Sequence, residues 1–141
     1  LDADTYLVDL PGYGYAKVPP EIRAKWEALL SRYLQEREAL VGMVLIMDAR
    51  HPLTPLDRQM LDWFTPTGKP VHILLSQADK LSNSEKALTL RRVKQELAGM
   101  DGVTVQLFSS LSRLGAEDAA TLIEGWLKHD EVRIEEAVQK A

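Results

Sequence analysis

Four short apolar runs, separated by longer stretches with helical periodicity, constrain the fold of this chain more than any other feature. The runs span residues 5–9, 43–48, 71–76 and 103–108. Each run is nearly continuous rather than alternating, which is typical of strands whose two faces are both covered. Strands that alternate with helices favour right-handed crossovers, so the pattern predicts an α/β fold with a mostly parallel sheet.

The stretches between the runs carry apolar residues at the spacing of amphipathic helices. The first predicted helix follows Pro20 and places on one face Ile22, Trp26, Leu29, Leu30, Tyr33 and Leu34. A second, shorter helix carries Leu56, Met60, Leu61 and Phe64. Ser82 and Glu85 predict a capping box that opens a third helix, with the inward residues Leu90, Val93 and Leu97. A fourth helix carries Leu122, Ile123, Trp126 and Leu127, and residues 130–141 are expected to form a solvated helical tail.

Length and composition fit one domain with a single core. The chain has 141 residues, a formal net charge of −4 and no cysteine, so we expect neither disulfides nor a thiolate metal site. The acidic balance gives no general attraction to nucleic acid, and any RNA contact would need a local basic patch. No apolar run approaches the roughly 18 residues of a membrane span, so no membrane partner is expected.

Polar residues follow three of the four predicted strands, at the edge where parallel sheets bind ligands. The first strand ends in Asp9-Leu10-Pro11-Gly12. An aspartate at this point can hold a hydrated Mg²⁺ through water beside a phosphate. The glycine lets a backbone N–H approach that phosphate without a Cβ in the way. An ordinary Asp-Gly turn is the alternative interpretation.

The third strand ends in Ser76-Gln77-Ala78-Asp79-Lys80 and the fourth in Phe108-Ser109-Ser110. A fixed carboxylate at Asp79 could accept two hydrogen bonds from guanine, whose donor pair adenine lacks. Small residues at the fourth strand end could offer backbone N–H groups to the base carbonyl. Taken separately, these segments are a helix cap and an ordinary loop. Taken together with the first strand end, they predict one purine-nucleotide site.

Longer motifs at the same positions resemble one family. Residues 9–18 read Asp-Leu-Pro-Gly-Tyr-Gly-Tyr-Ala-Lys-Val, which resembles the D-L-P-G-Y-G-[YF]-A segment that forms switch II in EngB-type GTPases. Residues 48–53 read Asp-Ala-Arg-His-Pro-Leu and are similar to the family's D-x-R-H-P-L segment. Residues 76–80 and 108–110 are similar to its T-K-A-D-K and F-S-S nucleotide motifs. The likeness extends to about His129.

The resemblance implies a three-layer Ras-like P-loop GTPase fold, of which residues 1–141 would form the C-terminal two-thirds, without the N-terminal strands and P-loop. It implies Mg²⁺ binding by Asp9 through water, and no catalytic residue is assigned. It also implies a cytoplasmic protein that acts with the RNA and proteins of the large ribosomal subunit during assembly, and that supports normal cell division and septum formation. The residues implied in GTP and GDP binding are Asp9, Leu10, Pro11, Gly12, Ser76, Gln77, Ala78, Asp79, Phe108, Ser109 and Ser110.

Three departures from the family pattern modify these expectations. Gln77 stands where the family has lysine, so we expect weaker nucleotide binding with guanine specificity retained through Asp79. Tyr13 stands where Ras-like proteins carry a water-orienting glutamine, so hydrolysis is expected to be slow, unless Tyr13 is only a packing residue. No G-x-x-x-x-G-K-[ST] loop is present. This chain alone is therefore expected to bind nucleotide weakly.

Two functions compete on these observations. One is a GTP-hydrolysing assembly factor, which Asp9, Gly12 and Asp79 favour. The other is a non-catalytic ribosome- or partner-binding module with a degenerate nucleotide site, which Gln77 and the missing loop favour. A loop of the P-loop type encoded upstream would decide for the first.

A few other polar residues have two interpretations. Arg50 and His51 suggest phosphate contact or acid–base work, although a loop histidine before proline is more often structural. His72 lies within an apolar strand and is expected to be a satisfied core or edge histidine. A basic helix face is either a solvated surface or a ribosome contact. That face consists of Lys86, Arg91, Arg92 and Lys94.

Overall fold

The computed structural model describes residues 7–8 and 19–127. Of the strand expected at residues 5–9, only Leu7 and Val8 are described, and neither lies in a strand; the switch II segment at 9–18 and the expected tail at 130–141 lie outside the described residues. The main elements run in the order α1 (Pro20–Glu36), β1 (Met43–Asp48), α2 (Pro55–Phe64), β2 (Val71–Ser76), α3 (Asn83–Glu96) and β3 (Val103–Leu107). Two 3-10 turns, η1 (Thr65–Thr67) and η2 (Ala78–Lys80), lie between them, and a last helix covers residues 116–127.

The three described strands form one parallel sheet in the order β1-β2-β3. Met43 pairs with Val71, and Val71 with Val103, so the strands begin in register. The predicted α/β class and parallel sheet are therefore confirmed. β1 and β2 have the predicted bounds, whereas β3 ends one residue early, at Leu107. The reason is that the carbonyl of Phe108 accepts the N–H of Ala78 in the loop after β2, at 3.1 Å.

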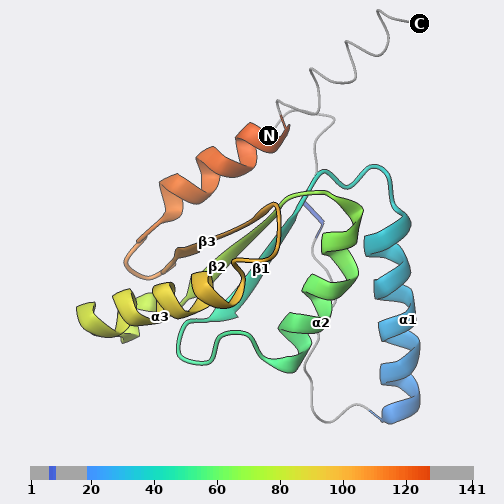
Figure 1. Cartoon of the computed structure of the whole chain (residues 1–141), viewed down its shortest axis with the longest axis horizontal. Helices are drawn as coiled ribbons and strands as arrows, with labels where there is room; N and C mark the ends of the chain where they lie inside the picture. Colours follow the sequence, from blue (N-terminus) through green and yellow to red (C-terminus); the bar gives the residue numbers. More distant parts are fainter. Residues whose placement is uncertain (1–6, 9–18, 128–141) are drawn as a thin grey trace, which may run out of the picture.

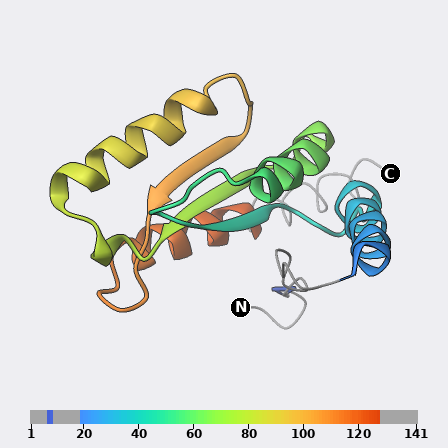
Figure 2. The same ribbon diagram turned by 90° about the horizontal axis from the view of Figure 1, so that it is seen from below.

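Helices cover both faces of the sheet. Figure 2 shows α2 and α3 on one face and the helix of residues 116–127 on the other. α1 packs chiefly against α2 rather than against the sheet (Figure 1). The described elements thus form three layers, as expected. Within the described part of the chain, no helix combines the length and apolarity needed to cross a membrane.

The core lies between the sheet and the helices α2 and α3. The odd-numbered residues of β1 and β2 all point into it: Met43, Leu45, Met47, Val71, Ile73 and Leu75. From the helices, the same core receives Met60, Leu61, Phe64, Val93 and Leu97. Each such side chain stabilises the fold by about 1.5–3 kcal/mol when fully buried. This layer therefore carries most of the hydrophobic stabilisation and fixes β2 in the middle of the sheet.

The helices that cover this core begin at capping boxes. The Ser82 hydroxyl accepts the N–H of Glu85 at 3.2 Å, and the Glu85 carboxylate accepts the N–H of Ser82 at 3.0 Å. These hydrogen bonds lower the pKa of Glu85. The predicted start of α3 is therefore confirmed. A second box, formed by Thr54 and Asp57, opens α2 and was not predicted.

α1 forms where it was expected, but its apolar face is only partly buried. Leu34 is 2% exposed, whereas Ile22, Trp26 and Leu29 remain 47%, 40% and 65% exposed. Among the described residues, α1 meets mainly α2, and the part of its apolar face that packs against the core carries Leu30, Tyr33 and Leu34. Helical spacing predicts which residues share a face, but it does not predict how much of that face is covered.

The second face of the sheet contains a polar network around His72, which is 3% exposed. Its Nε2 lies 2.7 Å from Oε1 of Gln106, and its Nδ1 lies 2.6 Å from Oγ1 of Thr104. Gln106 donates its amide N–H to the carbonyl of Gly115 at 2.8 Å, so its oxygen faces the histidine. Nε2 then donates to Gln106, and Nδ1 forms a hydrogen bond with the Thr104 hydroxyl, which also donates to the Val71 carbonyl at 3.4 Å. His72 is thus a satisfied core histidine, one of the two interpretations drawn from the sequence.

Candidate functional site

The carboxyl ends of the three strands meet at one edge of the sheet, where the candidate residues were expected. Asp48 pairs in register with Ser76. Hydrogen bonding continues past the strands, since Ala49 N–H donates to the Ser76 carbonyl and Phe108 N–H to the Leu75 carbonyl, both at 2.9 Å. The loops that follow the strands are therefore held to one another by backbone bonds. The backbone positions that carry the candidate side chains are therefore fixed.

The loop after β2 turns sharply at Gln77. This residue adopts a left-handed conformation, with φ 57° and ψ 32°, which costs a non-glycine residue about 1 kcal/mol. The turn leads into η2, where Lys80 N–H donates to the Gln77 carbonyl at 3.1 Å. Ala78 is buried, and the Ser76 hydroxyl donates to the Met47 carbonyl at 3.0 Å. The backbone that carries Asp79 is thus tied to both neighbouring strands.

Asp79 and Ser109 come from different strand ends and touch. The Ser109 hydroxyl donates to Oδ1 of Asp79 at 2.7 Å, and Ser109 is fully buried. Ser109 is itself held, because its oxygen accepts the N–H of Ser112 at 3.1 Å. Asp79 remains partly exposed. The carboxylate is therefore fixed by a buried donor while part of it stays open to a ligand with N–H groups.

The loop after β3 wraps around this contact. Ser109 N–H donates to the Leu114 carbonyl at 3.0 Å, which closes the loop on itself. Gly115 follows with φ +76°, and a Cβ there would approach the Leu107 carbonyl oxygen to 2.3 Å. Only glycine fits this position without moving the backbone. Ser110, the remaining expected residue of the loop, is exposed.

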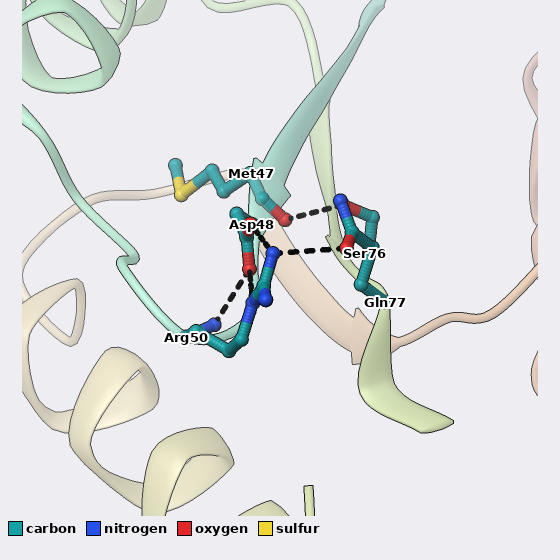
Figure 3. Close-up of polar contacts among 5 residues, drawn as sticks. All are labelled: Met47, Asp48, Arg50, Ser76 and Gln77. Carbon is teal, nitrogen blue, oxygen red and sulfur yellow. Dashed lines mark hydrogen bonds and ion pairs between the residues drawn. The ribbon is translucent and has the colours of Figure 1, made fainter. Parts of the chain in front are cut away.

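Arg50 is a further charged group at this edge, shown in Figure 3. Its Nε and Nη2 donate to the two oxygens of Asp48, at 3.0 and 2.8 Å. Nη2 also donates to Oε1 of Gln77 at 2.9 Å, which joins the ends of β1 and β2. The hydrogen bond from Arg50 is the main reason that the pKa of Asp48 falls to about 2. The pKa of Arg50 is raised, first by Asp48 and in smaller part by the charge of Asp79.

Four of the expected binding residues lie outside the described residues: Asp9, Leu10, Pro11 and Gly12. Their place relative to Asp79 stays a prediction, and so does the Mg²⁺ contact of Asp9. Among the residues that the structure describes, no group of three or more His, Cys, Asp or Glu could hold a metal ion.

Sequence reasoning placed Asp79 and Ser109 at neighbouring strand ends but missed how Arg50 is used. The sequence suggests phosphate contact or acid–base work for Arg50 and His51, whereas in the structure the side chain of Arg50 bonds to Gln77, 27 positions further along the chain. One signal was available. An aspartate at a strand end followed two residues later by arginine allows a local ion pair across a turn, and Arg50 N–H also donates to Asp48 Oδ1 at 2.9 Å.

The comparison with known proteins is decisive for the family. The chain is 86% identical over 127 residues to a protein of Thiobacillus denitrificans named "Probable GTP-binding protein EngB", covering 90% of this chain and 62% of that protein. It is 53% identical over 139 residues to a protein of the same name from Methylobacillus flagellatus, covering 98% of this chain and 67% of that protein. The chain belongs to the EngB family. No family model matches it.

The EngB relatives are longer than this chain. It spans about 60% of the length of most of them, for example 59% of the protein from Aromatoleum aromaticum, to which it is 58% identical. Among solved structures, the nucleolar GTP-binding protein 1 of Plasmodium falciparum aligns with 21% identity and a TM-score of 0.48, covering 89% of this chain and 63% of that chain. A likeness that low carries no argument. Assignment to the EngB family rests on the sequence matches.

Proposed function

We propose that this chain forms the base-recognition part of a GTP-binding protein of the EngB type. The observation that carries the proposal is the contact between Asp79 and the buried Ser109 at the shared edge of the sheet. Guanine presents a ring N–H and an exocyclic amine side by side, and one carboxylate can accept from both. A carboxylate fixed beforehand avoids the cost of ordering it on binding.

The remaining parts of the proposed site come from the loops after β2 and β3 and from the segment that begins at Asp9. Ser76, Gln77 and Ala78 precede Asp79 in the loop after β2, whereas Phe108 and Ser110 flank Ser109 in the loop after β3, and together they would supply the loop backbone for GTP or GDP. Asp9 would hold Mg²⁺ through water, and Gly12 would approach the terminal phosphate. The phosphates also need a loop of backbone N–H groups that this chain lacks. The whole protein, rather than this chain alone, would then hydrolyse GTP slowly.

The cellular role is proposed from the family resemblance of the switch II and D-x-R-H-P-L segments. We place the protein in the cytoplasm, acting on the large ribosomal subunit through its RNA and proteins, with an effect on cell division and septum formation. The nucleotide would control this association. Sedimentation of the complete gene product with purified large subunits, compared in GTP and in GDP, tests the assignment. If the same amount of protein sedimented with the subunits in GTP, in GDP and without nucleotide, control by the nucleotide would be contradicted.

The base assignment has a sharper test at Asp79. Asparagine can accept from a ring N–H and donate to a carbonyl, which matches xanthine better than guanine. In the product of the complete gene, Asp79→Asn should weaken GDP binding by roughly 100-fold and tighten binding of xanthosine diphosphate. Titration calorimetry with GDP, xanthosine diphosphate and ADP measures the change.

The matched control is Asp62→Asn, the same change on the exposed side of α2. This variant should bind GDP like the unaltered protein. If the unaltered protein bound GDP and ADP equally well, or if Asp79→Asn kept full GDP affinity, Asp79 would not read the base and the proposal would fail.

The alternative is a partner-binding module without nucleotide chemistry, which Gln77 favours. The two functions differ in whether partner binding depends on the nucleotide site. If Asp79→Asn abolished GDP binding but left association with the large subunit unchanged, the module would be the better description. If association with the subunit were lost together with GDP binding, the GTP-binding function would be supported.

A further inference from the structure

Gln106 lies on β3, and its side-chain amide is bonded at both its oxygen and its nitrogen. Oε1 lies 2.7 Å from Nε2 of His72. Nε2 of Gln106 donates to the Gly115 carbonyl at 2.8 Å and to the Leu107 carbonyl at 3.2 Å. Carbonyl oxygens can only accept hydrogen bonds, so the amide nitrogen must be the atom that faces them. The amide therefore has a single orientation, directed at the end of the loop after β3.

Gly115 connects this amide to the start of the last helix. Its carbonyl accepts from Gln106 and also from the N–H of Ala119, the latter at 3.0 Å. The Gly115 backbone lies so close to the amide that an added Cβ would be 2.4 Å from Nε2 of Gln106. The end of the loop after β3 is thus held between a strand side chain and the first turn of a helix.

The same end of the loop is bonded to Ser109. Leu114 directly precedes Gly115, and its carbonyl accepts the N–H of Ser109 at 3.0 Å. The Ser109 hydroxyl donates to Oδ1 of Asp79 at 2.7 Å, and among the described residues it is the only group hydrogen-bonded to that carboxylate. A connected series of contacts therefore leads from Gln106, which belongs to none of the nucleotide motifs, to the residue that reads the base in the proposed site.

The position of Ser109 matters for one feature of the base. In the proposed site, Asp79 accepts from the ring N–H and from the exocyclic amine of guanine. Two such bonds form together only when the carboxylate lies close to the plane of the base, because hydrogen bonds weaken steeply as they bend. The Ser109 hydroxyl fixes the rotation of the carboxylate. If Ser109 moves, the carboxylate can turn, and one bond to the base can persist while the other is lost.

We propose that Gln106 is a positioning residue of the base site: by holding the loop that carries Ser109, it lets Asp79 discriminate guanine from hypoxanthine. Hypoxanthine has the ring N–H of guanine but lacks the exocyclic amine. The inference rests on the proposed function, since it assumes a guanine base beside Asp79. It assigns to Gln106 no contact with the nucleotide, only the position of the loop.

The test compares GDP with inosine diphosphate, which differ only in the exocyclic amine, in the product of the complete gene. Gln106→Glu keeps the length of the side chain and its acceptor toward His72 but loses both donors to the loop. Gln106→Met removes the whole amide at similar size, and it supplies the test if the carboxylate of Q106E prevents folding. Titration calorimetry gives the two dissociation constants, and their ratio is the measured quantity. Partial unfolding weakens both affinities by the same factor and leaves the ratio unchanged.

The unaltered protein should bind GDP roughly 10- to 100-fold more tightly than inosine diphosphate, as expected for one hydrogen bond to a charged group. Each Gln106 variant should reduce this ratio about fivefold or more. Ser109→Ala removes the contact with Asp79 directly and should reduce the ratio at least as much. The double variant S109A/Q106M should lose no more than S109A alone, because two residues that act through one contact are not additive.

Thr104→Val is the matched control, on the same strand and face as Gln106 and two residues before it. The substitution keeps the size of the side chain and removes the hydroxyl that lies 2.6 Å from Nδ1 of His72. Thermal unfolding of T104V should show a loss of stability, while the ratio stays unchanged because the bonds from Gln106 to the loop remain. If Gln106 only stabilised the fold, its variants would behave in the same way as T104V.

The outcomes separate this inference from the proposed function. If the unaltered protein does not bind GDP, the proposed function fails and this inference falls with it. If the unaltered protein binds GDP no more tightly than inosine diphosphate, or if the Gln106 variants keep the full ratio, this inference alone is overturned. The same conclusion follows if S109A/Q106M loses clearly more discrimination than S109A, since Gln106 would then not act through Ser109.

Discussion

The two faces of the sheet are built from different kinds of side chain. Toward α2 and α3, the strands present only apolar residues, and Phe64 of α2 lies against them without any exposed surface. Toward the helix of residues 116–127, β2 and β3 present His72, Thr104 and Gln106, joined by hydrogen bonds. Both faces are covered, but one is held by hydrophobic burial and the other partly by directed polar contacts.

The polar face is the one connected to the candidate site. Gln106 reaches from the network to the carbonyl of Gly115, at the end of the loop that begins with Ser109. Ser109 in turn holds Asp79. Hydrophobic burial has no preferred direction, whereas a hydrogen bond fixes the orientation of both partners. The difference suggests that the apolar face sets stability and that the polar face sets the position of the loop after β3.

The largest loss of stability is expected for a substitution in the core on the apolar face of the sheet. Phe64→Ala removes a fully buried ring from the core and should lower the free energy of unfolding by about 3–5 kcal/mol. Chemical denaturation of the protein measures this loss. Leu88→Ala on α3 is the control, because Leu88 is 48% exposed and should cost less than about 1 kcal/mol. Equal costs at the two positions would mean that the described core is wrong.

A smaller loss of stability, together with a change at the candidate site, is expected for a substitution at Gly115. A Cβ there would meet the Leu107 carbonyl oxygen at 2.3 Å and Nε2 of Gln106 at 2.4 Å, so Gly115→Ala must displace the loop. Gly68→Ala is a matched control, because Gly68 has φ +77° but nothing within 4 Å of the added Cβ. The control should cost about 1 kcal/mol from backbone strain alone, and Gly115→Ala about 3 kcal/mol.

Measurements of unfolding and of GDP affinity distinguish the two glycine variants. In the product of the complete gene, Gly115→Ala should also weaken GDP binding, since the displaced loop carries Ser109, while Gly68→Ala should not. If both variants lost the same stability and neither changed GDP affinity, the polar face would have no part in positioning the loop.

Much of this fold could be predicted because its elements follow from local patterns. The bounds of β1 and β2 were predicted from continuous apolar runs, and the start of α3 from the Ser82–Glu85 capping box. The exposure of Trp26 and Leu29 could not be predicted. Burial of a helix face depends on which element packs against it, and the periodicity of one helix carries no information about its neighbours.

In the candidate site, too, one contact could be predicted from the sequence and another could not. The meeting of Asp79 and Ser109 follows from parallel strands, whose carboxyl ends lie at one edge. The contact between Arg50 and Gln77 depends instead on the left-handed turn at Gln77 and on side-chain torsions, which no spacing rule predicts. The sequence shows that Gln77 lacks the charge of the family's lysine, and the structure adds that its side-chain oxygen accepts a hydrogen bond from Arg50 at the neighbouring strand end.

On the polar face of the sheet, His72→Leu should lower the stability of the fold moderately. The substitution puts an apolar side chain of similar size in place of the imidazole and leaves Oε1 of Gln106, which is partly buried, without its donor. The expected loss in the free energy of unfolding is about 2 kcal/mol. Ile46→Thr on the same face is the control, because Ile46 is 60% exposed and should change stability by about 0.5 kcal/mol or less. A loss at His72 no larger than at Ile46 would show that the network contributes nothing.

The smallest change in stability is expected at Asp48, which lies at the end of β1 beside the candidate site. Arg50 lowers its pKa from 3.8 to about 2 in the folded protein. A carboxyl with a lowered folded pKa stabilises the fold fully above its unfolded pKa and loses that contribution as the pH falls toward the folded value. The difference in stability between the protein and Asp48→Asn should therefore be constant above about pH 4.5 and shrink between pH 4 and pH 2.

The size of this difference should stay near 1 kcal/mol or below, because the ion pair is partly exposed and screened by water. Urea unfolding of both proteins at several pH values between 2 and 6 measures it, and the subtraction removes the titration of other carboxylates. A difference that did not change over this range would mean that Asp48 titrates alike in the folded and unfolded chain. Arg50 would then not be held by Asp48 in solution, and the orientation of its guanidinium toward Gln77 would lose its support.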